Sequence, residues 1–204
     1  MLDAQSTDAA EGERRTAAAA RIRAIFAQAS TVHLATAERS TSAMSAAADA
    51  MIAALARHNK ILTFGNGGSA ADAQHVAAEL VGRFQRNRQA LAAMALTTDT
   101  SIITSIANDF AYEQVFVRQI EAMGRPGDVA FGISTSGRSP NVLAALARAR
   151  ELQLTTIALV GPRAEPVADI VIPVAADSTA RIQEAHRTAL HAICELVEET
   201  FAGA

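Results

Sequence analysis

The sequence has few of the residues on which several protein classes depend. Its 204 residues include one cysteine, one tyrosine, one lysine and no tryptophan. With Cys194 as its single thiol, the chain can form no intrachain disulfide and no cysteine-based zinc finger. The scarcity of aromatic side chains argues against a protein that binds single-stranded nucleic acid by stacking on its bases.

An excess of positive charge and long apolar runs are also missing. Lys and Arg total 18 against 21 Asp and Glu, for a net charge of -3, which excludes a broadly basic nucleic-acid surface. No stretch reaches the roughly 18 apolar residues of a membrane helix, and the start, MLDAQSTDAAEGERR, lacks the apolar core of a secretory signal. We therefore expect a cytoplasmic protein with no nucleic-acid or membrane partner.

The N-terminal quarter of the chain has the pattern of helices. Residues 1–12 are small, polar and acidic, so we expect a flexible N-terminus and a single domain over residues 13–204. Apolar residues then recur at helical spacing in two runs, and Ser40 or Thr41 is the candidate N-cap of the second run. This pattern predicts two N-terminal helices that pair as a hairpin.

The rest of the chain alternates between short apolar runs and helical patterns. Helical patterns occupy 70–85, 112–123, 139–152 and 180–201. The apolar runs are Ile61 to Gly65, Leu91 to Leu96, Asp128 to Ser134, Leu154 to Gly161, and Ala168 to Val174. Continuous apolar strands alternating with helices predict an α/β fold, a doubly wound five-stranded parallel sheet flanked by helices. Ligands of such sheets bind beyond the carboxyl ends of the strands.

Two loops that follow predicted strands have compositions suited to anions. Gly65-Asn66-Gly67-Gly68-Ser69 precedes a helix, where free backbone N–H groups bind anions, although a plain tight turn explains this loop equally well. Ser134-Thr135-Ser136-Gly137-Arg138-Ser139 precedes Pro140 and offers four hydroxyls. One serine would satisfy a helix N-cap, so we favour a phosphate monoester as the ligand of the second loop.

Ionisable residues recur at helical spacing on two of the predicted helices. His75 and Glu79 are four residues apart and share a face, which suits two ligands of one metal, an acid/base pair or a solvated pair. Gln183 and His191 are two turns apart on one face of the last helix and can flank one ion or substrate. His186 is a rival ligand there, which we interpret instead as a helix-interface or surface residue.

Four segments together resemble sugar isomerase (SIS) domains, and most of all the sedoheptulose 7-phosphate isomerase (phosphoheptose isomerase) family. They are GNGGSAADAQHVAAELVGRF (65–84), SIANDF (105–110), GDVAFGISTSGRSPNV (127–142) and ARIQEAHRTALHAICELVE (180–198). The resemblance implies a zinc-assisted aldose–ketose isomerase that converts sedoheptulose 7-phosphate to D-glycero-D-manno-heptose 7-phosphate through an enediol(ate). It also implies one Zn²⁺ per subunit and a homotetramer with active sites at subunit interfaces.

The resemblance further implies a role for each matching residue. Glu79 and His191 match the acid/base residues of the family. The positions that match its metal ligands are His75, Glu79, Gln183 and His191. Those that match its substrate contacts are Asn66, Gly67, Gly68, Ser69, Glu79, Arg83, Asn108, Asp109, Ser134, Thr135, Ser136, Ser139 and Gln183.

One departure keeps a second function open. Many family members carry Asp before Arg-Ile-Gln, where this chain has Ala180. Ala180 resembles a sister branch of the fold, a tetrameric scaffold without enzyme activity that binds the bacterial replication initiator protein. The enzyme is favoured because Glu79 and His191, which that branch lacks, would be costly to bury without a function. A sugar-phosphate-sensing regulatory domain is the third alternative, and it would need no acid/base pair.

Overall fold

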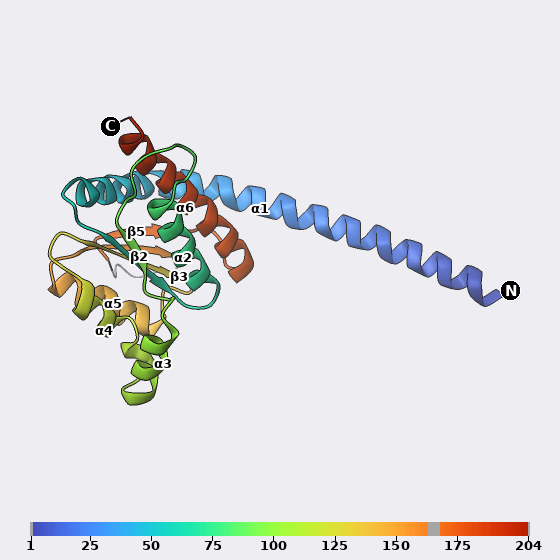
Figure 1. Ribbon diagram of the computed structural model, residues 1–204. Helices are drawn as coiled ribbons and strands as arrows, with labels where there is room; N and C mark the ends of the chain where they lie inside the picture. Colours follow the sequence, from blue (N-terminus) through green and yellow to red (C-terminus); the bar gives the residue numbers. More distant parts are fainter. Residues whose placement is uncertain (1, 163–167, 204) are drawn as a thin grey trace.

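The fold is a five-stranded parallel sheet between two layers of helices (Figure 1). The computed structural model describes residues 2–162 and 168–203, with side chains from residue 11 onward. Its elements are α1 (Leu2–Ala56), β1 (Ile61–Gly65), α2 (Gly68–Val81), β2 (Ala93–Ala95), α3 (Thr100–Asp109), the 3-10 helix η1 (Tyr112–Gln114), α4 (Val117–Met123), β3 (Val129–Ser134), α5 (Pro140–Glu151), β4 (Thr155–Val160), β5 (Ile170–Pro173) and α6 (Thr179–Phe201).

The sheet confirms the predicted fold class. Its strand order is β2-β1-β3-β4-β5, and every neighbouring pair is parallel. Successive residues of a strand point to opposite faces, so Ile61 packs with α1, α2 and α6 whereas Leu62 packs with α3, α4 and α5. Both faces are thus covered, which explains why β1 and β3 are buried along their whole length.

The predicted N-terminal hairpin is wrong, because α1 is one continuous helix that projects from the sheet (Figure 1). Residues 13–56 contain no glycine or proline to end a helix. Neither candidate N-cap starts a helix, because both residues lie inside α1. The Ser40 hydroxyl donates to the Pro173 carbonyl at 2.6 Å, and the Thr41 hydroxyl donates to the Ala37 carbonyl at 2.6 Å. Residues 2–12 belong to this helix and residue 1 lies outside the described residues, so flexibility of this segment stays a prediction.

Helix α3 was not among the predicted helices. Its residues 100–109 are rich in threonine, serine and isoleucine, which have modest helix propensity. The helix is started by Asp99, whose side chain accepts a hydrogen bond from the Ile102 N–H at 2.9 Å. The pattern at 112–123, predicted as one helix, is divided into η1 and α4. None of the described helices is long and apolar enough to cross a membrane.

His186 is buried between α6 and the sheet, as its helix-interface interpretation requires. Its side chain is 0% exposed, and neither ring nitrogen has a well-formed hydrogen bond to the described residues. Burial lowers the pKa of His186 to about 4, because the Val160 carbonyl and the Asp72 carboxylate offset only part of the desolvation. The imidazole is therefore neutral in the folded protein at neutral pH.

We predict that this histidine makes the fold sensitive to acid. Below pH ~6.5, His186 is protonated in the unfolded chain but stays neutral in the folded chain. The free energy of unfolding therefore falls as the pH falls towards 4. Between pH 7 and pH 5, His186 lowers the free energy of unfolding by about 2 kcal/mol. Urea unfolding of the wild type and of His186→Leu at both pH values measures it. The variant should lose less stability on acidification, and equal losses would contradict the assignment.

Candidate functional site

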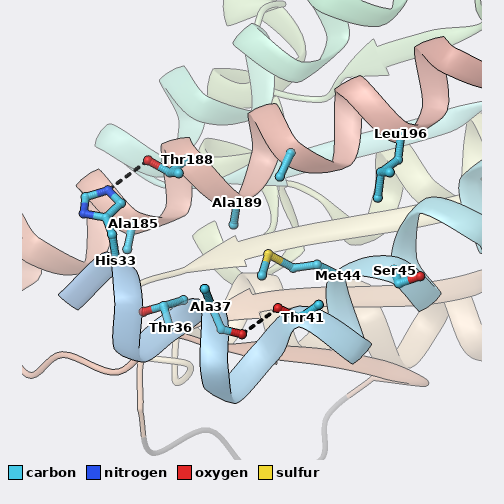
Figure 2. A pocket seen from close by; sticks show the side chains of 11 residues that line it. His33, Thr36, Ala37, Thr41, Met44, Ser45, Ala185, Thr188, Ala189 and Leu196 are labelled. Carbon is cyan, nitrogen blue, oxygen red and sulfur yellow. Dashed lines mark hydrogen bonds between the residues drawn. The ribbon is translucent and has the colours of Figure 1, made fainter. Parts of the chain in front are cut away.

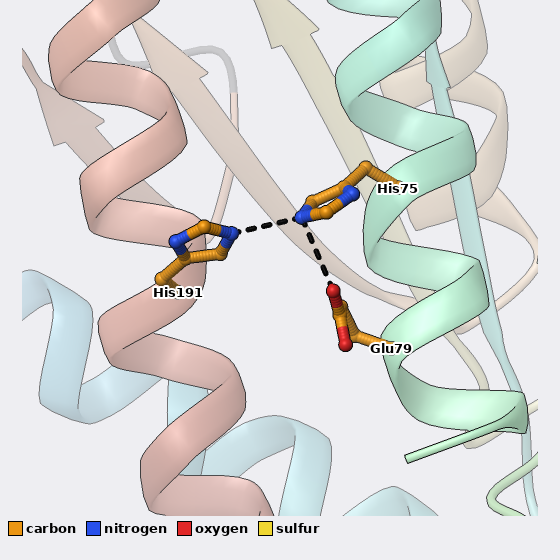
Figure 3. Close-up of side chains that lie close together, drawn as sticks. All are labelled: His75, Glu79 and His191. Atoms are coloured by element: carbon orange, nitrogen blue, oxygen red, sulfur yellow. Dashed lines mark hydrogen bonds and ion pairs between the residues drawn. The ribbon is translucent and has the colours of Figure 1, made fainter. Parts of the chain in front are cut away.

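Three ionisable side chains from two helices meet at one point (Figure 3). His75 and Glu79 lie on α2, and His191 faces them from α6. The Nε2 atoms of His75 and His191 are 2.8 Å apart, and His75 Nε2 lies 3.3 Å from Glu79 Oε1. All three side chains are half-buried. The i, i+4 pair on α2 is therefore no solvated surface pair, because the tertiary structure gives it a third partner.

Packing of α2 decides which of its side chains face α6. The helix buries Ala73, Val76 and Leu80 against the core, and its small residues let the neighbouring helix approach. Helix α6 buries Ala189, Leu190 and Ile193 in the same core. These apolar stripes fix the rotation of both helices about their axes, and they leave the ionisable residues at the line where the helices meet.

The surroundings of His75 keep its imidazole neutral. Burial lowers the pKa of His75, and the nearby positive charge of Arg187 lowers it further, while Glu79 acts in the opposite direction. Arg187 is held by buried Asp72, whose Oδ1 accepts from Nε at 2.8 Å and from Nη2 at 2.5 Å. A neutral imidazole is the form that binds a metal ion.

The donor atoms of the three residues suit a divalent metal. One ligand atom from each of His75, Glu79 and His191 lies within 4.8 Å of the other two. Two imidazole nitrogens and a carboxylate oxygen form the three-ligand set of many metal sites that leave a position open for substrate. The cluster could therefore hold a metal ion.

Gln183 lies beside the glycine loop, two turns from His191 on α6. Its amide packs so closely on Gly68 that a Cβ at Gly68 would be 2.3 Å from Nε2 of Gln183. Both residues line a hollow of about 460 Å³ together with Asp72 and Arg187. A side chain at this position would displace the amide of Gln183. The role of Gln183 as a metal ligand stays a prediction.

The glycine loop is tied to the other predicted anion loop by an amide pair that the sequence analysis missed. The Asn66 Nδ2 donates to Asn141 Oδ1 at 2.8 Å, and the Asn141 Nδ2 donates to Asn66 Oδ1 at 2.9 Å. The Tyr112 hydroxyl donates to Asn66 Oδ1 at 3.1 Å. Gly67 between the strand and the helix has φ 55°, a conformation that favours glycine. The two loops after β1 and β3 are thus held at one edge of the sheet.

The hydroxyl loop after β3 forms an open cradle at the start of α5. The Ser134 hydroxyl lies 3.0 Å from that of Ser139, and the backbone N–H of Arg138 donates to Ser136 Oγ at 3.1 Å. Ser139 precedes Pro140 but makes no side-chain cap bond, so one serine as a cap does not explain this loop. A hollow of about 370 Å³ adjoins it, lined by Thr135, Ser136, Arg138, Pro162, Asp177 and Ile182. Hydroxyls and a helix N-terminus together suit phosphate.

Three of the predicted substrate contacts are exposed, and a fourth is buried. Asn108 and Asp109 are at the end of α3, where the Asn108 Nδ2 donates to Asp109 Oδ1 at 2.7 Å. The Arg83 Nη1 donates to Asn87 at 3.2 Å, beyond the end of α2. Ser69 is buried in the first turn of α2. The substrate roles of these four residues stay predictions.

A separate hollow between α1 and α6 differs in character (Figure 2). It has a volume of about 470 Å³ and is lined mainly by small and apolar side chains, among them Met44, Ala189 and Leu196. At its rim, His33 Nε2 lies 2.9 Å from the Thr188 hydroxyl. The described ionisable side chains that could hold a metal ion lie instead at the His75 cluster.

Comparison with known proteins agrees with this geometry. A family model for the SIS domain matches residues 25–161. A phosphoheptose isomerase of Paramagnetospirillum magneticum is 58% identical over 158 residues, which cover 76% of this chain and 82% of that protein. The phosphoheptose isomerase of Aquifex aeolicus is 50% identical, over 88% of this chain and 95% of the relative.

A solved structure matches as well. The structure of phosphoheptose isomerase from Neisseria gonorrhoeae superposes with a TM-score of 0.80 at 41% identity and covers 88% of this chain and 97% of that one. The parallel α/β fold agrees with these matches. The chain belongs to the SIS domain family and, within it, to the phosphoheptose isomerases.

Proposed function

We propose that this isomerase converts sedoheptulose 7-phosphate to D-glycero-D-manno-heptose 7-phosphate. The observation that carries the proposal is the convergence of His75, Glu79 and His191, in a fold whose two candidate anion loops are tied together after β1 and β3. An aldose–ketose isomerisation needs an acid and a base within reach of adjacent carbons. Relatives named phosphoheptose isomerase at 50% and 58% identity supply the substrate class.

The substrate is bound at its remote end and reacts at the other. The hydroxyls of Ser134, Thr135, Ser136 and Ser139 hold the phosphate, with help from the free N–H groups at the start of α5. Binding energy at the phosphate positions the carbonyl carbon and its neighbour. Contacts to the sugar come from the backbone and side chains of Asn66, Gly67, Gly68, Ser69, Arg83, Asn108 and Asp109.

Glu79 and His191 share the proton transfers between C1 and C2. One of them removes the proton from carbon, and the other handles the proton on oxygen, through an enediol(ate). One zinc ion per subunit would be held by His75, Glu79, Gln183 and His191, of which three already converge. The chemistry that zinc supplies when bound is polarisation of the substrate carbonyl. Among these four residues, Gln183 would be the weakest zinc ligand, because it offers a neutral amide oxygen.

The active protein is a homotetramer in the cytoplasm, with active sites at subunit interfaces. This proposal is supported by the apolar residues that α1 leaves uncovered: Ile22 is 55% exposed, Phe26 72% and Leu34 67%. Phe26 lines a hollow of about 440 Å³ that shares His33 with the apolar hollow between α1 and α6. A second copy of the chain would bury such surface. Sedimentation of the purified protein gives the number of subunits.

The proposal is tested by an isomerisation assay with sedoheptulose 7-phosphate, before and after treatment with a chelator. We expect formation of the aldoheptose 7-phosphate, its loss on chelation and its return with added zinc. No turnover with zinc bound would point to another sugar phosphate, for which Ala180 would be the first residue to examine. No turnover and no zinc binding would favour the scaffold function, which Ala180 resembles, and would overturn the proposal.

Glu79 is tested in the same assay. The Glu79→Gln variant keeps the size of the side chain and removes its ability to carry a proton, so we expect kcat to fall about 100-fold or more with folding intact. Circular dichroism checks the fold. Turnover near that of the wild type would remove Glu79 from the chemistry.

The phosphate cradle is tested through Ser136. Because Ser136 contacts the substrate far from the reacting carbons, Ser136→Ala should raise KM more than it lowers kcat. Ser42→Ala, which removes an exposed hydroxyl from α1, is the matched control and should leave both constants unchanged. An unchanged KM in Ser136→Ala would contradict the assignment of the cradle.

A further inference from the structure

A buried ion pair lies next to the His75 cluster and none of its members has a role in the proposed chemistry. Glu198 on α6 is 3% exposed, and the side chain of Arg88, in the segment after α2, is 1% exposed. Arg88 Nε lies 3.5 Å from Glu198 Oε1. Burying such a pair costs much of what the attraction returns, so its presence calls for a reason other than stability.

The carboxylate of Glu198 organises the chain that leaves α2. It accepts hydrogen bonds from three consecutive backbone N–H groups, those of Phe84 at 2.9 Å, Gln85 at 2.8 Å and Arg86 at 2.9 Å. Burial alone would raise the pKa of Glu198, but these bonds outweigh it and hold the pKa below its usual value. The group is therefore an anion at neutral pH, held in a nest of backbone donors.

The guanidinium of Arg88 holds the end of α2 at the cluster itself. Its Nη2 donates to the carbonyl of Glu79 at 2.6 Å, and its Nη1 donates to the carbonyl of Leu80 at 2.8 Å. Carbonyls in the last turn of a helix lack partners within the helix, and a cation placed there satisfies them. Arg88 thus fixes the backbone of Glu79, one of the three residues that converge.

Phe84 connects Glu198 with His191. The phenyl ring lies against the imidazole, with ring centroids 5.5 Å apart and planes at 45°. Its backbone N–H is one of the three that Glu198 accepts. Glu198 is also seven residues beyond His191, two turns along one face of α6. The pair therefore connects the helix that carries Glu79 with the helix and the ring that orient His191.

We propose that Glu198 and Arg88 are positioning residues for the isomerase site. By fixing the Glu79 backbone and the Phe84 ring, the pair sets the distance between the ligands on α2 and His191 on α6. Neither residue contacts the substrate. The inference rests on the proposed function, because its consequence is a site held ready for zinc and for proton transfer.

The test compares two buried carboxylates of the same chain. Glu198→Gln keeps the shape of the side chain but replaces an accepting oxygen by an NH₂ group that faces backbone donors. Asp128→Asn is the matched control, since Asp128 is 1% exposed and accepts from the backbone N–H of Lys60 and of Arg125. Asp128 precedes β3, at the sheet edge opposite the strand ends where the loops lie. Both variants should lose thermal stability.

Zinc affinity and the kinetic constants separate the two variants. The zinc Kd is measured by competition with a chromophoric chelator, and kcat and KM are measured in the isomerase assay. We expect Glu198→Gln to raise the zinc Kd and lower kcat about tenfold each, with KM within about twofold of the wild type. Asp128→Asn should change none of the three. Equal effects of both variants, or none from Glu198→Gln, would overturn the inference.

A second variant covers the case in which Glu198→Gln does not fold. Arg88→Lys keeps the charge but cannot bind two carbonyls as a planar fork, so it should weaken zinc binding in the same direction. A folded Arg88→Lys protein with the wild-type zinc Kd and kcat would overturn the inference. A wild-type protein that neither binds zinc nor isomerises the sugar phosphate would instead remove the proposed function, and this inference with it.

Discussion

The packing of α2 against α6 is the contact on which the site depends. Each helix carries an apolar stripe that is buried on the same face of the sheet, and these stripes set the rotation of both helices. As a result His75 and Glu79 face His191 across the line of contact. A rotation of either helix by one residue, about 100°, would turn these side chains away from each other.

Buried carboxylates then fix the positions of groups around the cluster that apolar packing alone would not fix. Asp72 holds Arg187 beside His75, and Glu198 with Arg88 holds the end of α2. Hydrophobic contacts are not directional, whereas a carboxylate that accepts several N–H bonds has a defined position. Two carboxylates, Asp72 and Glu198, therefore lie buried around a site whose side chains must stay within about 0.5 Å of their places.

Features that depend on neighbouring residues were predicted from the sequence, whereas features that depend on contacts between distant residues were missed. All five strands were predicted, Ile61–Gly65 at its observed bounds and the others within two residues, because a continuous apolar run needs two covered faces wherever it occurs. The hairpin failed because Ser40 caps nothing and donates to Pro173, a residue 133 positions away. Helix α3 was missed because its propensity is weak and Asp99 alone marks its start. The Asn66–Asn141 pair was missed because the local sequence around either asparagine does not indicate which residue it contacts.

The sequence by itself determined the fold class and the placing of His75 and Glu79 on one helix face, because apolar periodicity and i, i+4 spacing are local properties of the chain. Only the tertiary structure decided that α1 is one helix, that His191 completes the cluster and that Glu198 reaches the chain after α2. These contacts join residues more than 100 positions apart. Their geometry is set by the packing of helices on the sheet, and no local pattern records it.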